Sequence, residues 1–456
     1  MELSSLTAIS SLDGRYAKKT EQLRPIVSEY GLIFYRLIAE IHWLIALSEN
    51  DQINEIPKLT ENDKNNLRLI MNQFNQAEAE KIKAIEATIN HDVKAVEYYL
   101  REKLSLDKNL KNLCAWIHFA CTSEDINNLA YALMQKTLRD QIIEPAILNL
   151  ISAIDTLAKK TAEFSMLSRT HGQPASPTTL GKELKNFAVR LKLQLKLLLT
   201  IPMMGKCNGA VGNFNAHVIA YPEVNWLLLS KNFVESLGLH YNEYTTQIEP
   251  HDFLAQFLNA LSACHLIMID FNRDIWGYIS QDYFTQMKSE QEVGSSTMPH
   301  KINPIDFENA EGNLGLSIAL ANHLANKLPI SRFQRDLSDS TVLRNLGSIF
   351  GYAIIAYQAM LSGLNKLKPN KTQLENTLNQ HWEILTEAIQ TVMRRYNITD
   401  AYEQLKILSR GEKIDSAKLN LFIDQLTIPD ATKKRLKKLT PCNYTGLATE
   451  LANKEI

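Results

Sequence analysis

The feature that most constrains the fold of this chain is its scarcity of helix-breaking residues. Glycine occurs 17 times and proline 14 times in 456 residues, so glycine is well below its usual share of about 7%. The segment from Glu249 to Met287 holds one proline, at its start, and one glycine. Its apolar residues follow helical spacing and also cover the other faces, so we expect a long helix buried on every side.

Helix-compatible stretches recur along the rest of the chain, and strong strand patterns do not. We expect helices at residues 26–47, 62–85, 122–164, 178–200, 304–327 and 343–367. Asn90 is expected to cap a further helix, Pro145 to kink the 122–164 helix, and residues 168–174 to form a loop. The predicted fold class is all-α, with domains at residues 1–110, 111–367 and 368–456. Surplus apolar surface on a long-helix bundle favours oligomerisation.

Composition limits the possible partners. The net charge is −1, so no global field attracts nucleic acid or an anionic membrane, and an anionic substrate needs a local cationic cluster. The five cysteines include no Cys-x-x-Cys pair, which indicates reduced, cytoplasmic thiols. The N-terminus does not resemble a signal peptide, and no uninterrupted apolar run reaches about 18 residues.

Residues 291–304 combine a loop with a helix start. Glycine and serines precede Asn303 and Pro304, which suit the N-cap and the first position of a helix. A helix N-terminus presents free N–H groups to an anion, and Lys301 is adjacent. These features fit an anion site under a hydroxyl-bearing loop. They fit a serine-rich surface loop that caps a helix equally well.

Other polar segments also lie at expected loops or helix ends, where sites usually form. They are Arg15-Tyr16, Asn90-His91-Asp92, Thr122-Ser123, Arg169–Gly172, and Arg332–Asp336 with Ser340, Thr341 and Arg344. Each has a structural interpretation as well: His91 could cap a helix, His171 could bond to its own turn, and Arg335 could join a surface ion pair.

Residues 294–304, Gly-Ser-Ser-Thr-Met-Pro-His-Lys-Ile-Asn-Pro, resemble the signature of the fumarase/aspartase superfamily, whose lyases release fumarate from succinyl compounds. Segments 90–97, 122–128, 168–174 and 304–309 are similar to those of bacterial adenylosuccinate lyases. The similarity extends in order from Asp13 to near the C-terminus. It implies a three-domain all-α fold and a homotetramer whose active sites combine segments of three subunits. We expect no cofactor, metal, nucleic acid or membrane partner.

The resemblance implies two β-eliminations of fumarate. One converts adenylosuccinate to AMP, and the other acts on the succinylaminoimidazole carboxamide ribotide of purine biosynthesis. It assigns the general acid to His171 and the general base to Ser295. A histidine titrates near neutral pH. A serine hydroxyl needs backbone N–H groups, a helix N-terminus or Lys301 to favour its deprotonation, with water excluded.

The resemblance also divides the substrate-binding residues by the part of the substrate that they contact. The nucleotide and phosphate side has Arg15, Tyr16, Arg335, Ser340 and Arg344, and Thr341 is a further substrate-binding residue that is assigned to neither side. The succinyl side has Thr122, Ser123, Ser296, Lys301 and Asn303. The pocket is completed by Asn90, His91, Asp92, Gln247 and Asn309. His91 could share or compete for the acid role of His171.

Three alternatives remain at this point. The first is another member of the superfamily, such as argininosuccinate lyase or carboxymuconate cycloisomerase. The second is an HD-type metal phosphohydrolase, because His91-Asp92 and His251-Asp252 are two His-Asp pairs. The third is a non-catalytic structural role, against which the retention of His171, Ser295 and Lys301 argues.

Overall fold

The computed structural model describes residues 1–287, 298, 301–409 and 414–455. The chain divides into two compact units. Unit 1 comprises residues 1–146, 194–266 and 312–356, and unit 2 comprises residues 147–193, 267–311 and 357–456. The helices with residues in both units are α7 (Glu144–Lys160), α8 (Leu180–Leu199), α11 (Asp252–Ser280), α12 (Ile305–Lys327) and α14 (Leu346–Lys366).

Unit 1 is mainly helical. Its further helices are α1 (Arg24–Val27), α2 (Glu29–Glu49), α3 (Glu61–Asn72), α4 (Gln76–Ile89), α5 (Asp92–Ser105), α6 (Ser123–Leu138), α9 (Asn215–Ala220), α10 (Trp226–Ser236) and α13 (Ser338–Leu343). Short 3-10 turns lie at Glu21–Leu23 and Lys111–Ala115, and two residues each of β3 (Met204–Gly205) and β4 (His240–Tyr241) pair in parallel.

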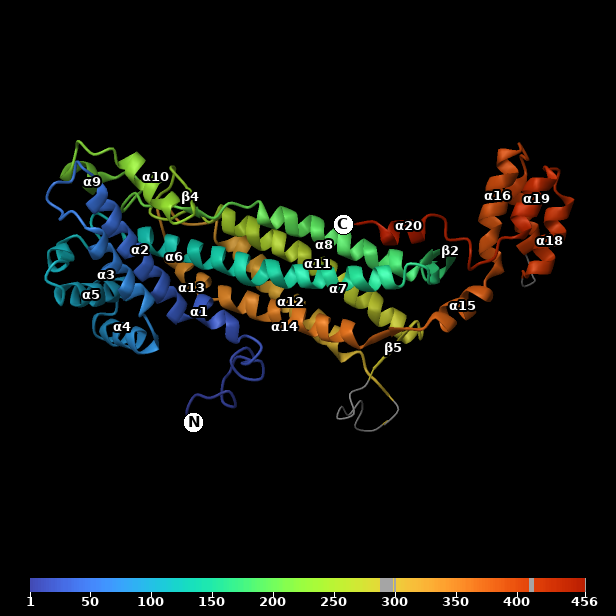
Figure 1. Cartoon of the computed structure of the whole chain (residues 1–456), viewed down its shortest axis with the longest axis horizontal. Coiled ribbons are helices and arrows are strands. Elements are labelled where there is room, and N and C mark those ends of the chain that lie inside the picture. Colours follow the sequence, from blue (N-terminus) through green and yellow to red (C-terminus); the bar gives the residue numbers. More distant parts are fainter. Residues whose placement is uncertain (288–297, 299–300, 410–413, 456) are drawn as a thin grey trace. The chain divides into compact units, whose positions relative to one another are not determined.

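Helix α2 packs against α6 in the core of unit 1 (Figure 1). It begins where the Ser28 hydroxyl accepts a hydrogen bond from Gly31 N at 3.3 Å, as N-cap serines do. Leu37, Ile41 and Trp43 on this helix are fully buried, and the Trp43 indole N–H donates to Phe119 O at 3.0 Å. Removing apolar surface from water contributes about 25 cal/mol per Å², and the burial of these side chains therefore stabilises the packing of α2.

Unit 2 carries small strands as well as helices. The strands are β1 (Ser165–Thr170), β2 (Gln173–Thr179), β5 (Phe284–Gln286) and β6 (Leu367–Pro369), and the helices are α15 (Lys371–Asn379), α16 (Thr386–Arg395), α17 (Ala401–Ser409), α18 (Ser416–Gln425), α19 (Asp430–Lys437) and α20 (Ala448–Asn453), with a 3-10 turn at Trp382–Leu385. Its C-terminal helices enclose a core that includes Leu378, Met393, Leu419 and Leu436.

The structure confirms the all-α class and corrects several details. The helix expected at 62–85 is two helices, α3 and α4, and the Asn75 side chain caps the second by accepting from Glu78 N. Residues 168–174 are not a loop but part of an antiparallel hairpin of β1 and β2. Two prolines in β2 obscured this strand, because proline cannot donate to a ladder and suits only edge strands.

The helix expected at 122–164 is interrupted by a π-helical turn at Arg139–Ile143, which ends two residues before Pro145. Proline has no N–H to donate and its ring crowds the preceding turn. The wider π turn accommodates this disruption within the helical path, as π bulges commonly do. The three-domain division with boundaries at residues 110 and 367 stays a prediction.

Among the described residues, four helical stretches are long and apolar enough to cross a membrane, judged by length and composition alone: Glu29–Glu49, Ser123–Lys160, Asp252–Ser280 and Ser338–Lys366. Between 44% and 72% of the most apolar window of each is buried within the protein. These four helices contain no long uninterrupted apolar run, because charged residues occur within them. In α2, for example, the charged residues Arg36 and Glu40 interrupt the apolar sequence and are themselves buried.

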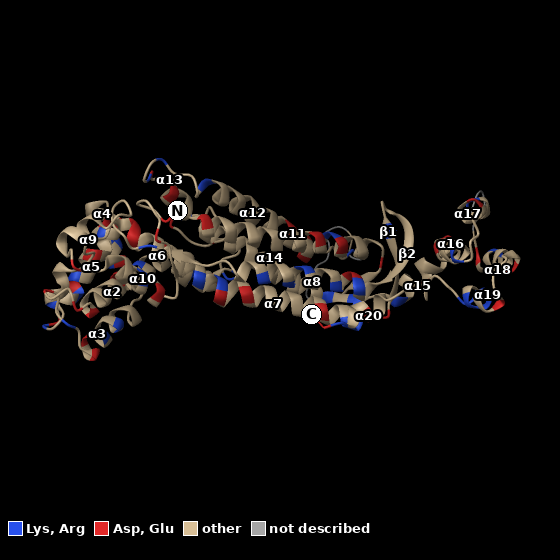
Figure 2. Cartoon of the chain, turned by 90° about the horizontal axis from the view of Figure 1, so that it is seen from above, with Lys and Arg blue, Asp and Glu red and all other residues tan. Residues whose placement is uncertain are grey.

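The surface charge is mixed. Figure 2 shows Lys and Arg interspersed with Asp and Glu along helices such as α7 and α8. Within unit 2, Lys185 on α8 pairs with Asp155 on α7 at 2.5 Å. This distribution agrees with the net charge of −1 and places any anion-binding capacity in local clusters.

A glycine in unit 2 allows close helix packing and provides a stability test. A Cβ at Gly181 would lie 2.3 Å from Ala158 O and 2.6 Å from Ala162 Cα, whereas a Cβ at Gly277 would meet nothing within 4 Å. We expect Gly181→Ala to lower the free energy of unfolding by about 1–3 kcal/mol through overpacking. Gly277→Ala, the matched control, should leave it unchanged or raise it by up to about 1 kcal/mol. Denaturant unfolding measures both, and equal effects would contradict the packing argument.

Candidate active site

The N-terminus of α6 presents the predicted residues Thr122 and Ser123. Thr122 N donates to Asp125 Oδ2 at 2.8 Å, which closes the first turn of the helix. Asp125 Oδ1 also lies 2.8 Å from Lys206 Nζ, and both side chains are completely buried. A buried carboxylate needs such a partner, because its desolvation is otherwise very costly.

Asp125 also holds the glycine-rich segment that follows β3. Its Oδ1 accepts from Asn208 N at 2.9 Å, and its Oδ2 accepts from Gly209 N at 3.1 Å. Asn208 Nδ2 in turn donates to Thr245 Oγ1 at 2.7 Å. One buried carboxylate therefore fixes the start of α6 and residues 205–213, and through Asn208 it is connected to the segment that carries Gln247.

Arg335 and Gln247, predicted as substrate-binding residues, lie together in unit 1. Arg335 Nη1 donates weakly to Gln247 Oε1 at 3.4 Å, and Gln247 Nε2 donates to Ala210 O at 3.0 Å. Arg335 Nη2 lies 2.9 Å from Oε1 of Glu124. Glu124 is buried and directly follows Ser123 in the first turn of α6. The guanidinium is thus oriented by the same helix start that presents Thr122 and Ser123.

Asp92 and Arg344, which were each predicted as substrate-binding residues, pair in the structure although they are 252 residues apart in sequence. Arg344 Nη2 lies 3.0 Å and Arg36 Nη2 2.7 Å from Asp92 Oδ2, and Arg344 Nη1 lies 2.7 Å from Glu29 Oε2. Burial raises the pKa of Asp92, but the two guanidinium groups outweigh it and hold the pKa below its usual value. Asp92 is therefore ionised near neutral pH.

His91 and Asn90 occupy the junction before α5. His91 is the N-cap residue, and its Nδ1 accepts from Lys94 N at 3.1 Å. Asn90 is not the N-cap, as expected from the sequence, but ends α4 in a left-handed conformation with φ of 55°. Asparagine adopts this conformation more readily than most residues. The capping role that the sequence left open for His91 is therefore present.

The remaining predicted residues of unit 1 are more exposed. Arg15 is exposed, with its guanidinium carbon 6.0 Å from the centre of the Tyr16 ring. Ser340 and Thr341 lie in α13, where Ser340 N donates to Asp339 Oδ1 at 2.6 Å. Thr341 is exposed, and Tyr16 and Ser340 are half-buried.

His171 lies at the tip of the β1–β2 hairpin in unit 2. Thr170 and Gln173 are paired, so His171 and Gly172 form a two-residue loop. Their φ angles are 52° and 75°, positive at both positions as in a type I′ turn. The imidazole is exposed, and among the described residues it makes no hydrogen bond to its own turn. Arg169 Nη1 donates a hydrogen bond to Gly172 O at 3.2 Å and so stabilises the loop.

Three other predicted residues lie near the start of α12 in unit 2. Lys301 is exposed, while Asn303 and Asn309 are half-buried. The helix begins at Ile305, one residue later than the expected start at Pro304. Pro304 O accepts from Phe307 N and Glu308 N at 3.1 and 3.2 Å. Ser295 and Ser296 lie outside the described residues.

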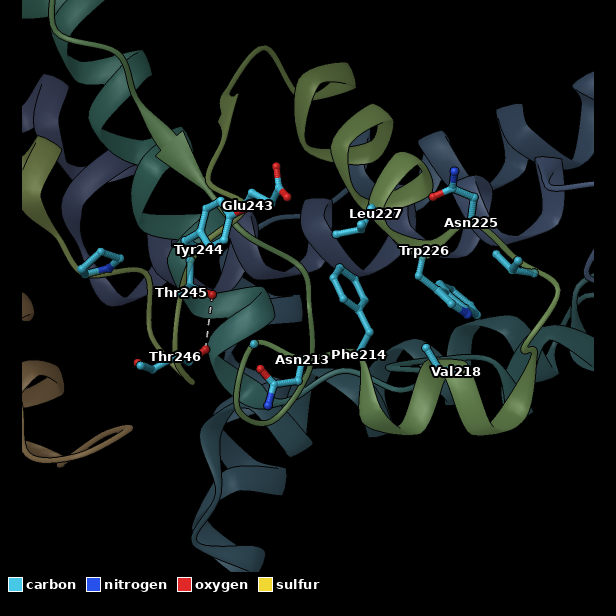
Figure 3. A pocket seen from close by; sticks show the side chains of 13 residues that line it. Asn213, Phe214, Val218, Asn225, Trp226, Leu227, Glu243, Tyr244, Thr245 and Thr246 are labelled. Atoms are coloured by element: carbon cyan, nitrogen blue, oxygen red, sulfur yellow. Dashed lines mark hydrogen bonds between the residues drawn. The ribbon is translucent and has the colours of Figure 1, made fainter.

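A cavity of about 870 Å³ lies between residues 212–218, the start of α10 and residues 243–250 in unit 1 (Figure 3). Phe214, Trp226, Tyr244 and Thr246 are among its lining residues. It contains none of the predicted site residues, although Gln247 follows Thr246 directly. A smaller cavity of about 430 Å³ beside the N-terminal segment is lined in part by Glu29 and Arg344.

One group of side chains has the composition of a metal site. Ligand atoms of Cys121, Asp125 and Cys207 lie within 4.8 Å of one another. Burial raises the pKa of both thiols, so they stay protonated, and Asp125 already binds Lys206. The groups therefore fit a hydrogen-bonded ion pair better than a cation site, since metal ligation requires thiolates.

Comparison with known proteins identifies the family. Residues 14–316 match the family model described as Lyase, and residues 331–445 match the model described as Adenylosuccinate lyase C-terminal. The chain is 56% identical over 451 residues to an adenylosuccinate lyase of Legionella pneumophila (strain Corby), with 99% of both chains covered. It is 53% identical over 453 residues to the adenylosuccinate lyase of Escherichia coli K12, again with 99% of both covered. The chain belongs to the adenylosuccinate lyase family.

Solved structures place adenylosuccinate lyases of this kind in a wider fold group. The chain is similar to the 3-carboxy-cis,cis-muconate lactonizing enzyme of Pseudomonas putida, with a TM-score of 0.70, 19% identity and 95% of both chains covered. It is also similar to the fumarate lyase of Mesorhizobium sp. BNC1, with a TM-score of 0.74, 16% identity and coverage of 95% and 96%. At these identities the likeness concerns the fold alone. The family-model matches and the full-length identities to the curated relatives confirm the superfamily assignment made from residues 294–304.

Sequence reasoning missed the residues that hold the site in this adenylosuccinate lyase family member. Glu124, Asp125, Lys206, His251 and Asp339 were not proposed as part of it. Glu124 and Asp125 did give a signal, because two acids in the first turn of a helix indicate a capping role. His251 gave a different signal, a His-Asp pair with Asp252, yet in the structure it faces Asp339 at 4.0 Å.

The buried Asp125–Lys206 pair gives a test of the scaffold. Asp125→Asn leaves the Lys206 charge buried without a counter-ion, so we expect the free energy of unfolding to fall by about 3–5 kcal/mol. Replacing both residues, as Asp125→Asn with Lys206→Met, should cost less than the sum of the single changes. The exposed Lys454–Glu450 pair is the control, because Glu450→Gln should cost less than about 1 kcal/mol. Additive single costs would contradict the coupling.

A histidine next to the start of α6 gives a pH test. His118 Nδ1 lies 2.6 Å from Oε1 of the fully buried Glu40. Burial lowers the pKa of His118, but the hydrogen bond and charge of Glu40 outweigh it and raise the pKa above its usual value. The pair therefore stabilises the fold fully below pH of about 6.5, the unfolded value, and this contribution is lost as pH rises through the raised pKa.

We expect the stability advantage of the parent over His118→Gln to shrink as pH rises above about 6.5. Denaturant unfolding of both proteins across the range from acid to mildly alkaline pH measures this difference. A difference that stays constant with pH would show that His118 does not change its charge on folding.

Proposed function

We propose that the chain releases fumarate from adenylosuccinate, giving AMP, and from the succinylaminoimidazole carboxamide ribotide of purine biosynthesis. The observation that best supports this is the full-length match, at 53–56% identity, to relatives named adenylosuccinate lyase. The match includes both family models, and the second is particular to adenylosuccinate lyases. This proposal replaces the HD-type phosphohydrolase, because Asp92 is bound by Arg36 and Arg344 and His251 faces Asp339.

In the proposed reaction a base removes a proton from the succinyl carbon next to a carboxylate, and an acid protonates the departing nitrogen. His171 is the proposed acid, and its exposure at a hairpin tip leaves the imidazole accessible to a substrate. Ser295 is the proposed base. Lys301, exposed near the N-terminus of α12, is the proposed partner for the charge that develops on the carboxylate.

We propose that one group of residues binds the nucleotide and its phosphate and that another group binds the succinyl part of the substrate. Arg335 and Arg344 are each held by carboxylates, Glu124 and Asp339 for the first and Glu29 and Asp92 for the second. Such pairing fixes the guanidinium groups before an anion arrives, which lowers the ordering cost of binding. Thr122 and Ser123, at the start of α6, are the proposed succinyl contacts.

A homotetramer with shared active sites and a cytoplasmic location complete the proposal. Its support is a set of large apolar side chains exposed on the long helices: Leu193, Leu197, Leu266, Trp276 and Leu316, each about half exposed. Exposed apolar surface of this kind commonly marks an interface between chains. The free cysteines agree with a reducing compartment. We propose no metal or cofactor, and activity should therefore survive a chelator.

The acid and base assignments are tested by single changes. We expect His171→Ala and Ser295→Ala each to lower kcat by about 10²–10⁴-fold, the usual contribution of a positioned proton-transfer group. Fumarate release, followed by absorbance with each succinyl substrate, is the measurement. Near-normal turnover by Ser295→Ala, beside an inactive His171→Ala, would show that another group is the base.

Mixing the two inactive variants tests the shared site. If His171 and Ser295 of one active site come from different subunits, hybrid tetramers contain some sites with both native residues. Activity should then reappear after the variants are unfolded and refolded together. No recovery in a mixture that forms tetramers would contradict active sites shared in this way.

A further inference from the structure

A chain of hydrogen bonds and ion pairs joins Arg344 to Arg335 in unit 1. Asp92 Oδ2 lies 3.0 Å from Arg344 Nη2 and 2.7 Å from Arg36 Nη2. Arg36, on α2, is buried, and its Nε donates to Asn127 Oδ1 at 2.8 Å. Its Nη1 has no hydrogen-bond partner among the described residues, so Asp92 and Asn127 are the polar groups that hold this guanidinium.

Asn127 continues the chain of contacts on α6. Its Nδ2 donates at 2.8 Å to Oε1 of the buried Glu124, which lies three residues earlier on the same helix. The same carboxylate oxygen lies 2.9 Å from Arg335 Nη2. Residues three apart are neighbours on a helix surface, so the amide lies beside the group that Arg335 contacts. Asn127 therefore links the buried guanidinium of Arg36 to the carboxylate that orients Arg335.

The side chain at position 127 has to accept one hydrogen bond and donate another. A guanidinium has no acceptor, so the amide oxygen of Asn127 faces Arg36 and its N–H group faces Glu124. An aspartate would have the same shape and could still accept from Arg36, but it would present a second carboxylate oxygen to Glu124. A leucine would have a similar shape and would form neither bond. Asparagine is therefore the residue of this shape that satisfies both partners.

We propose that Asn127 is a positioning residue for substrate binding, which holds Glu124 in place and so orients Arg335 toward the anionic part of the nucleotide. This rests on the proposed function, in which Arg335 contacts that nucleotide. The amide is anchored in turn by the buried guanidinium of Arg36. The effect of Asn127 reaches the substrate through Glu124 and Arg335, and it therefore belongs to binding rather than to the proton transfers of the reaction.

The first test is Asn127→Leu in the full-length enzyme. We expect the KM for adenylosuccinate and the dissociation constant of AMP, measured by calorimetry, to rise by about tenfold, as the loss of a hydrogen bond to a charged group commonly does. The kcat should stay within about twofold of the parent, because the anionic part of the nucleotide does not react. Asn65→Leu is the matched control and should change neither constant, since Asn65 is exposed on α3 and accepts from Arg68 Nη1 at 3.0 Å.

Asn127→Asp separates the two hydrogen bonds of the amide. It keeps the acceptor for Arg36 and loses the donor to Glu124, so it should raise the KM and the dissociation constant of AMP as well. An unchanged KM for Asn127→Asp would overturn the proposal, because the contact with Glu124 is the one through which the amide acts on Arg335.

Arg335→Gln shows whether the effect of Asn127 reaches the substrate through Arg335. In the Arg335→Gln background, Asn127→Leu should have little further effect on KM. An equal rise in KM in both backgrounds would overturn the proposal, because a merely structural role for Asn127 would add to the loss of Arg335. Thermal unfolding midpoints of all variants, and AMP binding measured without turnover, keep loss of folding distinct from loss of affinity.

The same variants separate this inference from the proposed function. A raised KM for Arg335→Gln with an unchanged KM for Asn127→Leu would overturn the role of Asn127 alone. An unchanged KM for Arg335→Gln would overturn the assignment of Arg335 and the role of Asn127 with it. Absence of fumarate release by the parent enzyme would overturn the proposed function itself, on which the role of Asn127 rests.

Discussion

The buried ion pair between Asp125 and Lys206 is the interaction on which the proposed binding residues of unit 1 depend for their position. Neither residue is among the proposed catalytic groups. The pair nevertheless holds the start of α6 and the glycine-rich segment at a fixed separation, because one carboxylate accepts from both. A buried pair of this kind is costly to desolvate, and its structural effect here is to fix the helix start that presents Thr122 and Ser123.

Arginines that pair with carboxylates recur in unit 1 near the Asp125–Lys206 pair. Arg335 and Arg344 each meet two carboxylates, so the binding side combines fixed donors with little excess positive charge. This suits a chain with a net charge of −1, which cannot attract anions from a distance. In the proposed function, recognition of an anionic substrate therefore depends on the local geometry of these arginines.

Long elements were predictable from sequence, and the contacts between them were not. The scarcity of glycine and proline predicted α11, which runs from Asp252 to Ser280. The β1–β2 hairpin was missed, because its prolines and serines resemble a loop. The partners Asp92 and Arg344 were each proposed through family resemblance, but nothing local in the sequence joins residues 252 positions apart. Their pairing is a property of the folded unit, which only packing creates.

In the loop of the β1–β2 hairpin, the residue at position 171 is not the one that the turn conformation favours. A two-residue loop with positive φ at both residues favours Asn-Gly, yet residue 171 is histidine with φ of 52°. Asparagine there would fit the turn with less backbone strain but could not donate a proton to a leaving group. If the imidazole is the proton donor, the chain tolerates conformational strain to keep it, and selection for stability alone would remove it. Position 171 is thus a place where stability and activity trade against each other.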